Sequence, residues 1–303
     1  ANDMGPEALE GVFRALGSHY GAAITVISGD ELLEQNFPMI HAVGRAAKDA
    51  PRLLDMRWGK EGAPKVTLVG KGVCFDTGGL DIKPASSMLL MKKDMGGAAN
   101  VLGLALMIMD AGLDVDLRVL IPAVENSIAG DAFRPGDILK SRKGLSVQID
   151  NTDAEGRLVL GDALTYACED KPELLIDMAT LTGAARVALG PDLPPYYTDD
   201  EAFSDDLADA ADQVADPLWR MPLYQRYEAM LDVPAADITN APAGGFGGSI
   251  TAALFLRRFV EKQISWCHLD IFGWTPKAQP HAPVGGQAQG IRALYQLMCD
   301  RYR

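Results

Sequence analysis

The sequence predicts an α/β protein with a mainly parallel, doubly wound sheet that is covered by helices on both faces. Short apolar runs of strand length alternate along the chain with longer runs that have helical spacing. The strand-like runs are almost continuously apolar, which is typical of strands buried on both faces. No stretch is long enough to link separate domains, so we expect one domain over residues 1–303.

Six runs are expected to form the strands of this sheet. Each is short, largely apolar or β-branched, and bounded by Gly, Pro or charged residues. They lie at residues 23–27, 66–69, 117–121, 145–149, 174–178 and 267–271.

Helical spacing of apolar residues marks four further segments, at 97–109, 158–167, 250–260 and 291–298. The Gly-rich stretch 241–248 and the Pro-containing stretch 191–195 are expected to be loops. Since strands and helices alternate, most strands should run parallel and end at one edge of the sheet.

Charge and composition exclude several classes of protein. The net charge of −13 argues against nucleic acid as a partner, because phosphate binding requires clustered Lys and Arg. No apolar run reaches the roughly 18 to 20 residues of a membrane helix, and residues 1–10 show no export signal. The widely spaced cysteines are typical of buried, reduced thiols, so we expect a cytoplasmic protein; they are Cys74, Cys168, Cys267 and Cys299.

Two segments place charged residues directly after apolar strands. Residues 71–83 (KGVCFDTGGLDIK) follow the run 66–70, and Asp94 comes shortly afterwards. Residues 151–157 (NTDAEGR) follow the run 145–150 and lead into a helix. Ligands of open α/β sheets bind outside the carboxyl ends of the strands, so both segments are candidates for an active site.

Four carboxylates in these segments would repel one another if they met: those of Asp76, Asp94, Asp153 and Glu155. Two carboxylates about 4 Å apart repel by about 4 kcal/mol at an effective dielectric constant near 20. A dication removes that repulsion, and oxygen ligands favour Mg²⁺, Mn²⁺ or Zn²⁺. The alternative is that each carboxylate caps a helix or stays in water; for Asp153 and Glu155, beside Arg157, we favour the metal site.

Other ligand-binding and catalytic motifs are absent or incomplete. Residues 151–162 approximate an EF-hand calcium loop, but Asp162 stands where Glu is usual and a strand precedes the loop. No Walker or Gly-x-Gly-x-x-Gly spacing opens a helix, and no serine lies in a Gly-x-Ser-x-Gly elbow. None of the histidines forms a His-Glu-x-x-His pair; they are His19, His41, His268 and His281. We interpret His268, inside an apolar run, as a core histidine.

At the two charged segments the sequence closely resembles the leucine aminopeptidase (cytosol aminopeptidase) family. Residues 151–158 (NTDAEGRL) look like that family's signature, unbroken. Residues 69–72, 75–79, 82–83 and 91–99 match its other block, and 179–184, 251–253 and 268–271 are further matches. The resemblance covers residues 66–273 and, more loosely, the start of the chain.

The resemblance implies the catalytic domain of a metallo-aminopeptidase with two divalent ions, Zn or Mn, with Mg as a further option. The implied metal ligands are Lys71, Asp76, Asp94, Asp153 and Glu155. Asp76 and Glu155 would be shared, Lys71 and Asp94 would complete the tighter site, and Asp153 would serve the other. A neutral lysine at pH 7 requires about 4 to 5 kcal/mol, which a dication in a buried pocket can supply.

By the same resemblance, Lys83 and Arg157 are catalytic cations. Water between the two ions would attack the amino-terminal peptide bond, Lys83 would donate to the oxyanion, and Arg157 would hold a bicarbonate that passes protons to the leaving amine. The free amino group of the substrate would bind metal and Asp94. Family members form homohexamers and usually carry a separate amino-terminal domain, which we do not expect in this chain. Residues 285–290 depart from the family pattern and receive no role.

The pocket for the first substrate residue is implied to be lined by Met91, Thr180, Leu181 and Gly183, together with position 272. The family usually has a small residue there, commonly Ala, whereas this chain has Phe272. A ring in that place would fill the space that leucine needs and favour small first residues such as Ala or Gly. The alternative is that Phe272 packs into the core.

Two rival functions use some of the same features. Clustered carboxylates also serve metal-dependent phosphoesterases, for which an aryl phosphate rather than an amino-acid anilide would be the substrate. Some relatives in the family bind DNA, which allows a non-catalytic reading. The acidic charge and the complete set of candidate ligands argue against that second alternative.

Overall fold

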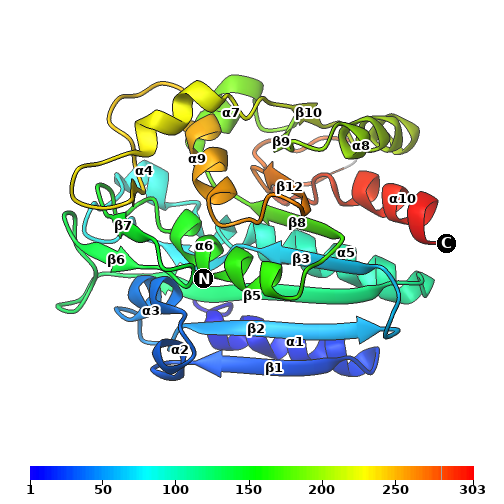
Figure 1. Ribbon diagram of the computed structural model, residues 1–303, viewed down its shortest axis with the longest axis horizontal. Helices are drawn as coiled ribbons and strands as arrows, with labels where there is room; N and C mark the ends of the chain where they lie inside the picture. Colours follow the sequence, from blue (N-terminus) through cyan, green and yellow to red (C-terminus); the bar gives the residue numbers. More distant parts are fainter. Residues whose placement is uncertain (281) are drawn as a thin grey trace.

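A nine-stranded mixed sheet forms the centre of the computed structural model, which describes residues 1–280 and 282–303 (Figure 1). Its strand order is β1-β2-β5-β3-β8-β12-β9-β10, with β4 also paired to β5. The four central strands are parallel and almost fully buried: β5 (Asp116–Asn126), β3 (Lys65–Gly70), β8 (Leu174–Ala179) and β12 (Ser265–Asp270). The predicted α/β fold is therefore confirmed.

Antiparallel pairs occur at both edges of this sheet. At one edge, β1 (Ala23–Ser28) pairs with β2 (Arg52–Gly59), which pairs with β5. At the other edge, β9 (Pro195–Tyr197) runs antiparallel to β12, and β10 (Trp219–Arg220) extends it. The four strands in the middle of the sheet are parallel, and one of them, β3, leads into the first of the charged segments.

Helices cover both faces of the sheet, and each layer encloses its own hydrophobic core. One face is covered by α1 (Pro6–His19), α5 (Gly96–Ala111), α8 (Glu201–Val214) and α10 (Ile291–Tyr302). The other face is covered by α3 (Pro38–Gly44), α6 (Gly156–Glu169) and α9 (Gly248–Arg257). In Figure 1, α6 and α9 lie in front of the sheet and α1 and α5 behind it.

Two strand predictions need correction. The run 145–149 forms β7 (Ser146–Gln148), which belongs to a separate three-stranded sheet with β6 (Ile138–Lys140) and β11 (Ile238–Thr239). Only the middle residue of β7 is buried, as in a strand with one covered face. The charged segment after β3, for which no strand was predicted, contains β4 (Gly72–Asp76), which pairs with β5.

Short elements complete the chain between these layers. They are α2 (Glu31–Glu34), α4 (Ala85–Met88), α7 (Gly183–Leu189), the 3₁₀ turns η1 (Met91–Lys93) and η2 (Gln225–Leu231), and the hairpin of β13 (Trp274–Thr275) with β14 (Gly285–Gly286). The hairpin falls inside the segment that the sequence analysis left without a role.

A glycine brings α5 into direct contact with the sheet. A Cβ atom at Gly97 would lie 2.1 Å from the carbonyl oxygen of Met178 on β8, far closer than non-bonded atoms approach. Only a residue without a side chain allows this approach. It places the start of α5, and the turn before it, against the end of β8.

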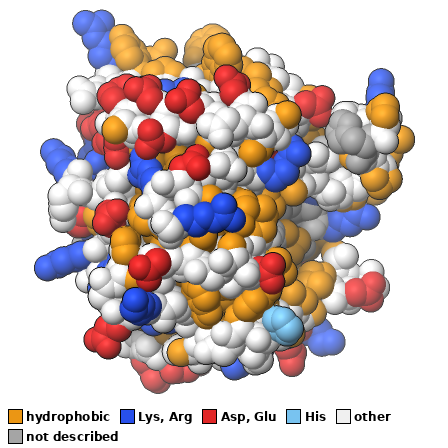
Figure 2. All heavy atoms as spheres, turned by 90° about the vertical axis from the view of Figure 1, so that its right-hand side faces the viewer, with side chains coloured by type: hydrophobic (Ala, Val, Ile, Leu, Met, Phe, Trp, Pro, Cys, Tyr) orange, Lys and Arg blue, Asp and Glu red, His pale blue; other side chains and the backbone are white. Residues whose placement is uncertain are grey.

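The surface carries charges of both signs. Figure 2 shows one face, on which hydrophobic side chains gather in the middle and acidic and basic side chains are scattered around them. All four cysteines are buried and unpaired. Among the described residues, no helix combines the length and apolar character that crossing a membrane requires.

Candidate active site

The charged segments meet in a cavity of about 610 Å³ at the carboxyl ends of the parallel strands. Every residue that the sequence analysis singled out for metal, catalysis or substrate lines this cavity, except Glu155. Glu155 lies beneath it, buried against Lys71. The structure therefore brings together side chains from β3, β4, α6, β8 and β12.

Lys71 directly follows β3 and is only 3 % exposed. Its Nζ lies 2.8 Å from Asp94 Oδ2 and 2.8 Å from Glu155 Oε1. Burial lowers the pKa of this amine, but the facing carboxylates outweigh it and raise the pKa above its ordinary value. Without a metal ion, the Lys71 ammonium thus neutralises two buried carboxylates.

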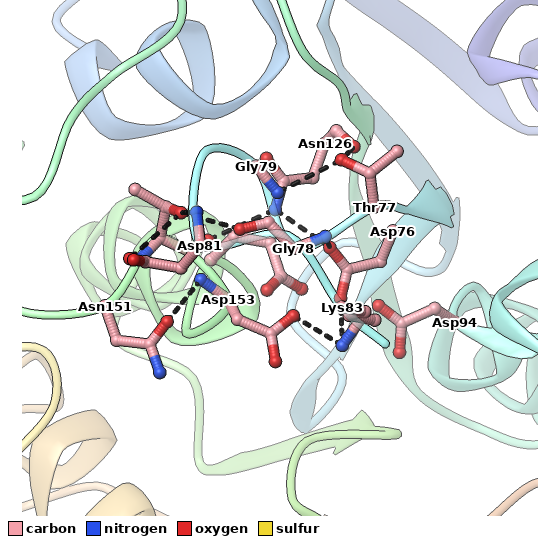
Figure 3. A network of polar contacts seen from close by, with 12 residues as sticks. Asp76, Thr77, Gly78, Gly79, Asp81, Lys83, Asp94, Asn126, Asn151 and Asp153 are labelled. Atoms are coloured by element: carbon pink, nitrogen blue, oxygen red, sulfur yellow. Dashed lines mark hydrogen bonds and ion pairs between the residues drawn. The ribbon is translucent and has the colours of Figure 1, made fainter. Parts of the chain in front are cut away.

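Lys83 holds the other two carboxylates, as Figure 3 shows. Its Nζ lies 2.9 Å from Asp76 Oδ2 and 2.5 Å from Asp153 Oδ1. Burial lowers the pKa of Lys83, and these two carboxylates more than compensate and raise it. Each of the two lysines therefore lies between two of the four carboxylates.

Asp76 is fixed by the turn that follows it. The backbone N–H of Gly78 and the side-chain amide of Asn126 both donate to Asp76 Oδ1, at 2.9 and 2.8 Å. Gly78 and Gly79 have φ values of 89° and 66°, which other residues adopt only with strain. Oδ2 of Asp76 is thereby left facing the cavity.

A second set of hydrogen bonds ties the two charged segments together. The Thr152 backbone N–H donates to Asp81 Oδ2 at 2.8 Å, and the Asp81 N–H donates back to Thr152 Oγ1 at 2.8 Å. Thr152 Oγ1 donates to the carbonyl of Gly78 at 2.6 Å. These hydrogen bonds hold the segment after β7 against the segment after β4. Asp153 therefore lies near Asp76 even though β7 belongs to a separate sheet.

The donor set fits divalent cations. Asp76, Asp153 and Glu155 each offer one carboxylate oxygen, and these oxygens lie within 4.8 Å of one another. Buried oxygens of Asp94, Asp153 and Glu155 accept no well-directed hydrogen bond, although a lysine ammonium is close to each. Asp153 and Glu155 belong to both groups, and crowded carboxylates with unsatisfied oxygens are the arrangement in which a hard cation is stabilised.

The pKa values express the same crowding. Burial and the neighbouring Asp76 raise the pKa of Glu155 to about 8 and that of Asp153 to about 6. For Asp94, burial is opposed by Lys71 and Lys93, which lower its pKa below the ordinary value. At Glu155 and Asp153, burial and the charge of Asp76 therefore outweigh the lysine beside each carboxyl, whereas at Asp94 the lysines outweigh burial.

Arg157 begins α6 and is 9 % exposed. Its Nη1 donates to the carbonyl of Asn240 at 2.6 Å, and Asn240 in turn binds the backbone of Asp150 and Asn151. The Arg157 Nε is buried without a hydrogen-bond partner among the described residues. Burial lowers the pKa of this guanidinium to about 10. The guanidinium lines the cavity, and its Nε donor remains available for a ligand.

Phe272 lines the cavity and is half-buried, so the ring is not part of the core. Gln289 holds its backbone: Gln289 Oε1 accepts from the N–H groups of Phe272 and Gly273 at 3.0 and 2.8 Å. Gln287 N–H donates to the carbonyl of Gly273 at 3.1 Å. The carboxyl-terminal segment around residues 285–290 thus supports one wall of the cavity.

Thr180 joins that wall to the acidic cluster. Its hydroxyl donates to Asp94 Oδ1 at 2.7 Å, and its methyl group would be 3.2 Å from a Cβ atom at Gly273. Met91, Leu181 and Gly183 also line the cavity at this side.

Two interpretations made from the sequence, those of His268 and Asp162, are tested by contacts outside the acidic cluster. His268 is fully buried, and its Nδ1 lies 2.6 Å from Asp177 Oδ1, as in a core histidine with a carboxylate partner. Asp162 accepts from the backbone N–H groups of Met39, Ile40 and Arg142, so it is not part of a calcium loop. His281 lies outside the described residues.

Sequence reasoning missed several residues that organise the site: Asn126, Thr152, Asn240 and Gln289. Asn126 ends strand β5, so its place at a carboxyl strand end was a usable signal. Gln289 and Asn240 are distant in sequence from the residues they hold, and nothing local marks them.

Comparisons with known proteins agree with this geometry. A model described as the catalytic domain of the cytosol aminopeptidase family matches residues 1–295. A probable cytosol aminopeptidase of Roseiflexus castenholzii is 43 % identical over 99 % of this chain and 62 % of its own length. A probable cytosol aminopeptidase of Geobacter is 41 % identical over 98 % of this chain and 61 % of its own length.

Solved structures are similar as well. The crystal structure of cytosol aminopeptidase from Coxiella burnetii superposes with a TM-score of 0.98 at 51 % identity, covering all of this chain and 66 % of that one. The bottromycin maturation enzyme BotP in complex with Mn gives a TM-score of 0.93 at 34 % identity over 98 % of this chain and 66 % of that one. This chain thus spans about three fifths of the length of the curated relatives.

Proposed function

Because the chain belongs to the cytosol aminopeptidase family, we propose that it removes single residues from the amino end of peptides by metal-dependent hydrolysis. The observation that carries this proposal is the cluster of unsatisfied carboxylate oxygens in the cavity, alternating with two lysines. A solved relative is described as a complex with Mn, which supports divalent metal here.

The residues that would hold two divalent ions are Lys71, Asp76, Asp94, Asp153 and Glu155. Zn or Mn fits this set of one amine and four carboxylates, and Mg is a further option. Once bound, such ions polarise the scissile carbonyl and lower the pKa of the attacking water. To serve as a ligand through its Nζ, Lys71 would have to release its proton, and the charge of a bound ion would offset the free energy of that release.

Lys83 keeps its proton, since Asp76 and Asp153 raise its pKa. Its ammonium lies at the cavity wall and donates to the oxyanion that develops on the substrate carbonyl. Asp94, on the Lys71 side, accepts a hydrogen bond from the free amino group of the substrate. A substrate held at both points loses one residue at a time, as an exopeptidase requires.

Arg157 is proposed to bind a small anion, in the family a bicarbonate, which passes protons to the leaving amine. The free Nε donor of the buried guanidinium supports this role. A neutral group there would leave that anion without a partner.

Chelation tests the proposal directly. Phenanthroline should abolish hydrolysis of an amino-acid anilide, and added Mn²⁺ or Zn²⁺ should restore it. An aryl phosphate serves as the second substrate, because a phosphoesterase would cleave it and ignore the anilide. Activity that survives exhaustive metal removal would contradict the metal-dependent mechanism.

We propose a homohexamer as the working assembly, on the strength of the family resemblance. Light scattering at micromolar concentrations should give a mass near six chains, and a monomer at every concentration would contradict this. The four unpaired, buried cysteines and the cytosolic relatives support a cytoplasmic location.

A further inference from the structure

Two cations flank the ring of Phe272 at the wall of the cavity. Lys93 Nζ lies 5.0 Å from the centre of this ring, and Arg186 Cζ lies 5.3 Å from it. All three residues line the cavity. The ring of Phe272 therefore lies next to two positively charged groups within the cavity.

Neither cation has an acidic partner. In the part of the chain that the structure describes, Lys93 and Arg186 form no ion pair, and neither side chain donates a hydrogen bond to protein. The other two lysines of the cavity, Lys71 and Lys83, each contact two carboxylates. An anion bound between the two cations would supply the opposite charge that neither receives from an ion pair.

The cation pair is built into the fold. Arg186 lies on α7, whose first turn is capped by Thr182: the Thr182 side chain accepts from Ala185 N–H. Asp270, at the end of β12, accepts from the Thr182 backbone at 3.0 Å and from its hydroxyl at 2.6 Å. On the opposite side, Gln289 holds the backbone of Phe272. One wall is thereby held by a residue at the end of β12, and the other by a residue of the loop before α10.

The pair lies beside the point where a substrate's amino group would bind. Lys93 immediately precedes Asp94 in the chain, and Thr180 donates a hydrogen bond to Asp94 while its methyl group lies 3.2 Å from where a side chain at Gly273 would begin. A substrate residue whose amino group binds Asp94 would place its side chain next to the wall formed by Lys93, Phe272 and Arg186. The positive charges therefore face the first side chain of a peptide.

We propose that the pocket selects acidic first residues, glutamate and aspartate, whose carboxylate binds between Lys93 and Arg186 while the methylene groups lie on the Phe272 ring. This inference rests on the proposed aminopeptidase function, of which it names the substrate class. A cation over an aromatic face is also common where no ligand binds. Lys92 over Trp274, at 5.4 Å and outside the cavity, is such a case in the same chain and provides the control.

Comparing each acidic substrate with its amide isolates the effect of the carboxylate charge. The kcat/KM values for Glu and Asp anilides should exceed those for Gln and Asn anilides about tenfold to a hundredfold, the usual effect of a hydrogen bond to a charged group. Arg186→Gln should lower kcat/KM for the Glu anilide far more than for the Gln anilide and so remove most of this ratio. Lys92→Gln should preserve the ratio. Arg186→Glu should shift the preference towards Lys and Arg anilides.

Peptide order and direct binding complete the test. Glu-Leu should be cleaved faster than Gln-Leu, whereas Leu-Glu and Leu-Gln should be cleaved equally; a preference that follows the second residue overturns the inference. Free L-glutamate should bind more tightly than L-glutamine by calorimetry, and Arg186→Gln should remove the difference. Tighter glutamate binding without hydrolysis of any peptide would retain the acidic subsite and reject the aminopeptidase function. Equal binding and equal kcat/KM for Glu and Gln would reject the subsite while hydrolysis upholds the aminopeptidase.

Discussion

The substitution Gly156→Ala places a methyl group directly on Lys71. A Cβ atom at residue 156 would lie 2.5 Å from Lys71 Cε, 2.7 Å from its Nζ and 2.9 Å from its Cδ. Carbon atoms in contact stand about 3.5 to 4.0 Å apart, so the end of the lysine must retreat by about 1 Å. It is almost fully buried and has little room to do so.

The retreat breaks the 2.8 Å contacts of the ammonium with Asp94 and Glu155. Removing one partner of a buried ion pair costs about 3 to 5 kcal/mol, and alanine gains about 1 kcal/mol over glycine in a helix. We therefore expect the free energy of unfolding of the metal-free protein to fall by about 2 to 4 kcal/mol. Binding of Zn²⁺ or Mn²⁺ should weaken by at least about tenfold, the usual effect of misplacing a ligand.

Urea unfolding of the metal-free protein measures the first effect, and equilibrium dialysis with elemental analysis measures the second. Gly11→Ala is the matched control, since Gly11 is also helical and a Cβ there meets no atom within 4 Å. The control should leave metal binding unchanged and should not lower stability. If Gly156→Ala behaved like Gly11→Ala, Lys71 would not occupy the place assigned to it.

Further substitutions separate the roles of individual groups. Glu155→Gln should lose metal together with activity, whereas Lys83→Ala should keep both ions and lose about 10²- to 10³-fold in turnover; elemental analysis showing an emptied site in Lys83→Ala would contradict its role as a donor. Phe272→Ala should raise the Leu-to-Ala ratio of kcat/KM about tenfold or more, and a ratio that stays within about twofold would show that the ring does not shape specificity. Burial raises the pKa of Glu10, but two arginines outweigh it and lower the pKa, so its contribution to stability is present above about pH 4.3 and is lost as the pH falls further. Glu10→Gln should accordingly reduce the free energy of unfolding at pH 7 by about 0.5 to 1 kcal/mol, allowing for solvent screening, and the difference from wild type in urea titrations should shrink as the pH falls below about 4.3.

The sequence predicted the central strands because their apolar residues are continuous, and it predicted the site because charged segments followed them. It missed β2, where Arg52, Asp55 and Arg57 interrupt the apolar pattern. Asp55 is buried against Arg118 of β5, with 2.7 Å between the charged atoms. The charges cancel only across the strand pair, which no local pattern can reveal.

The small sheet was misassigned for a related reason. An apolar run of strand length looks the same whether it joins a central or a peripheral sheet, and β7 differs in that the residues on one of its faces are only half-buried. The acidic site residues were recognisable as a group because their segments carry dense, local patterns. Lys93 and Arg186 both lie over the Phe272 ring in the folded chain, and no pattern in the neighbouring sequence marks either position.

The attachment of Phe272 by its main chain bears on how such a pocket can change over generations. Gln289 grips the N–H groups of residues 272 and 273 and makes no use of the ring. The side chain at 272 can therefore be exchanged while the loop that presents it keeps its course. Single substitutions at position 272 can therefore change which first residues the pocket accepts during evolution, while the residues of the acidic cluster stay the same.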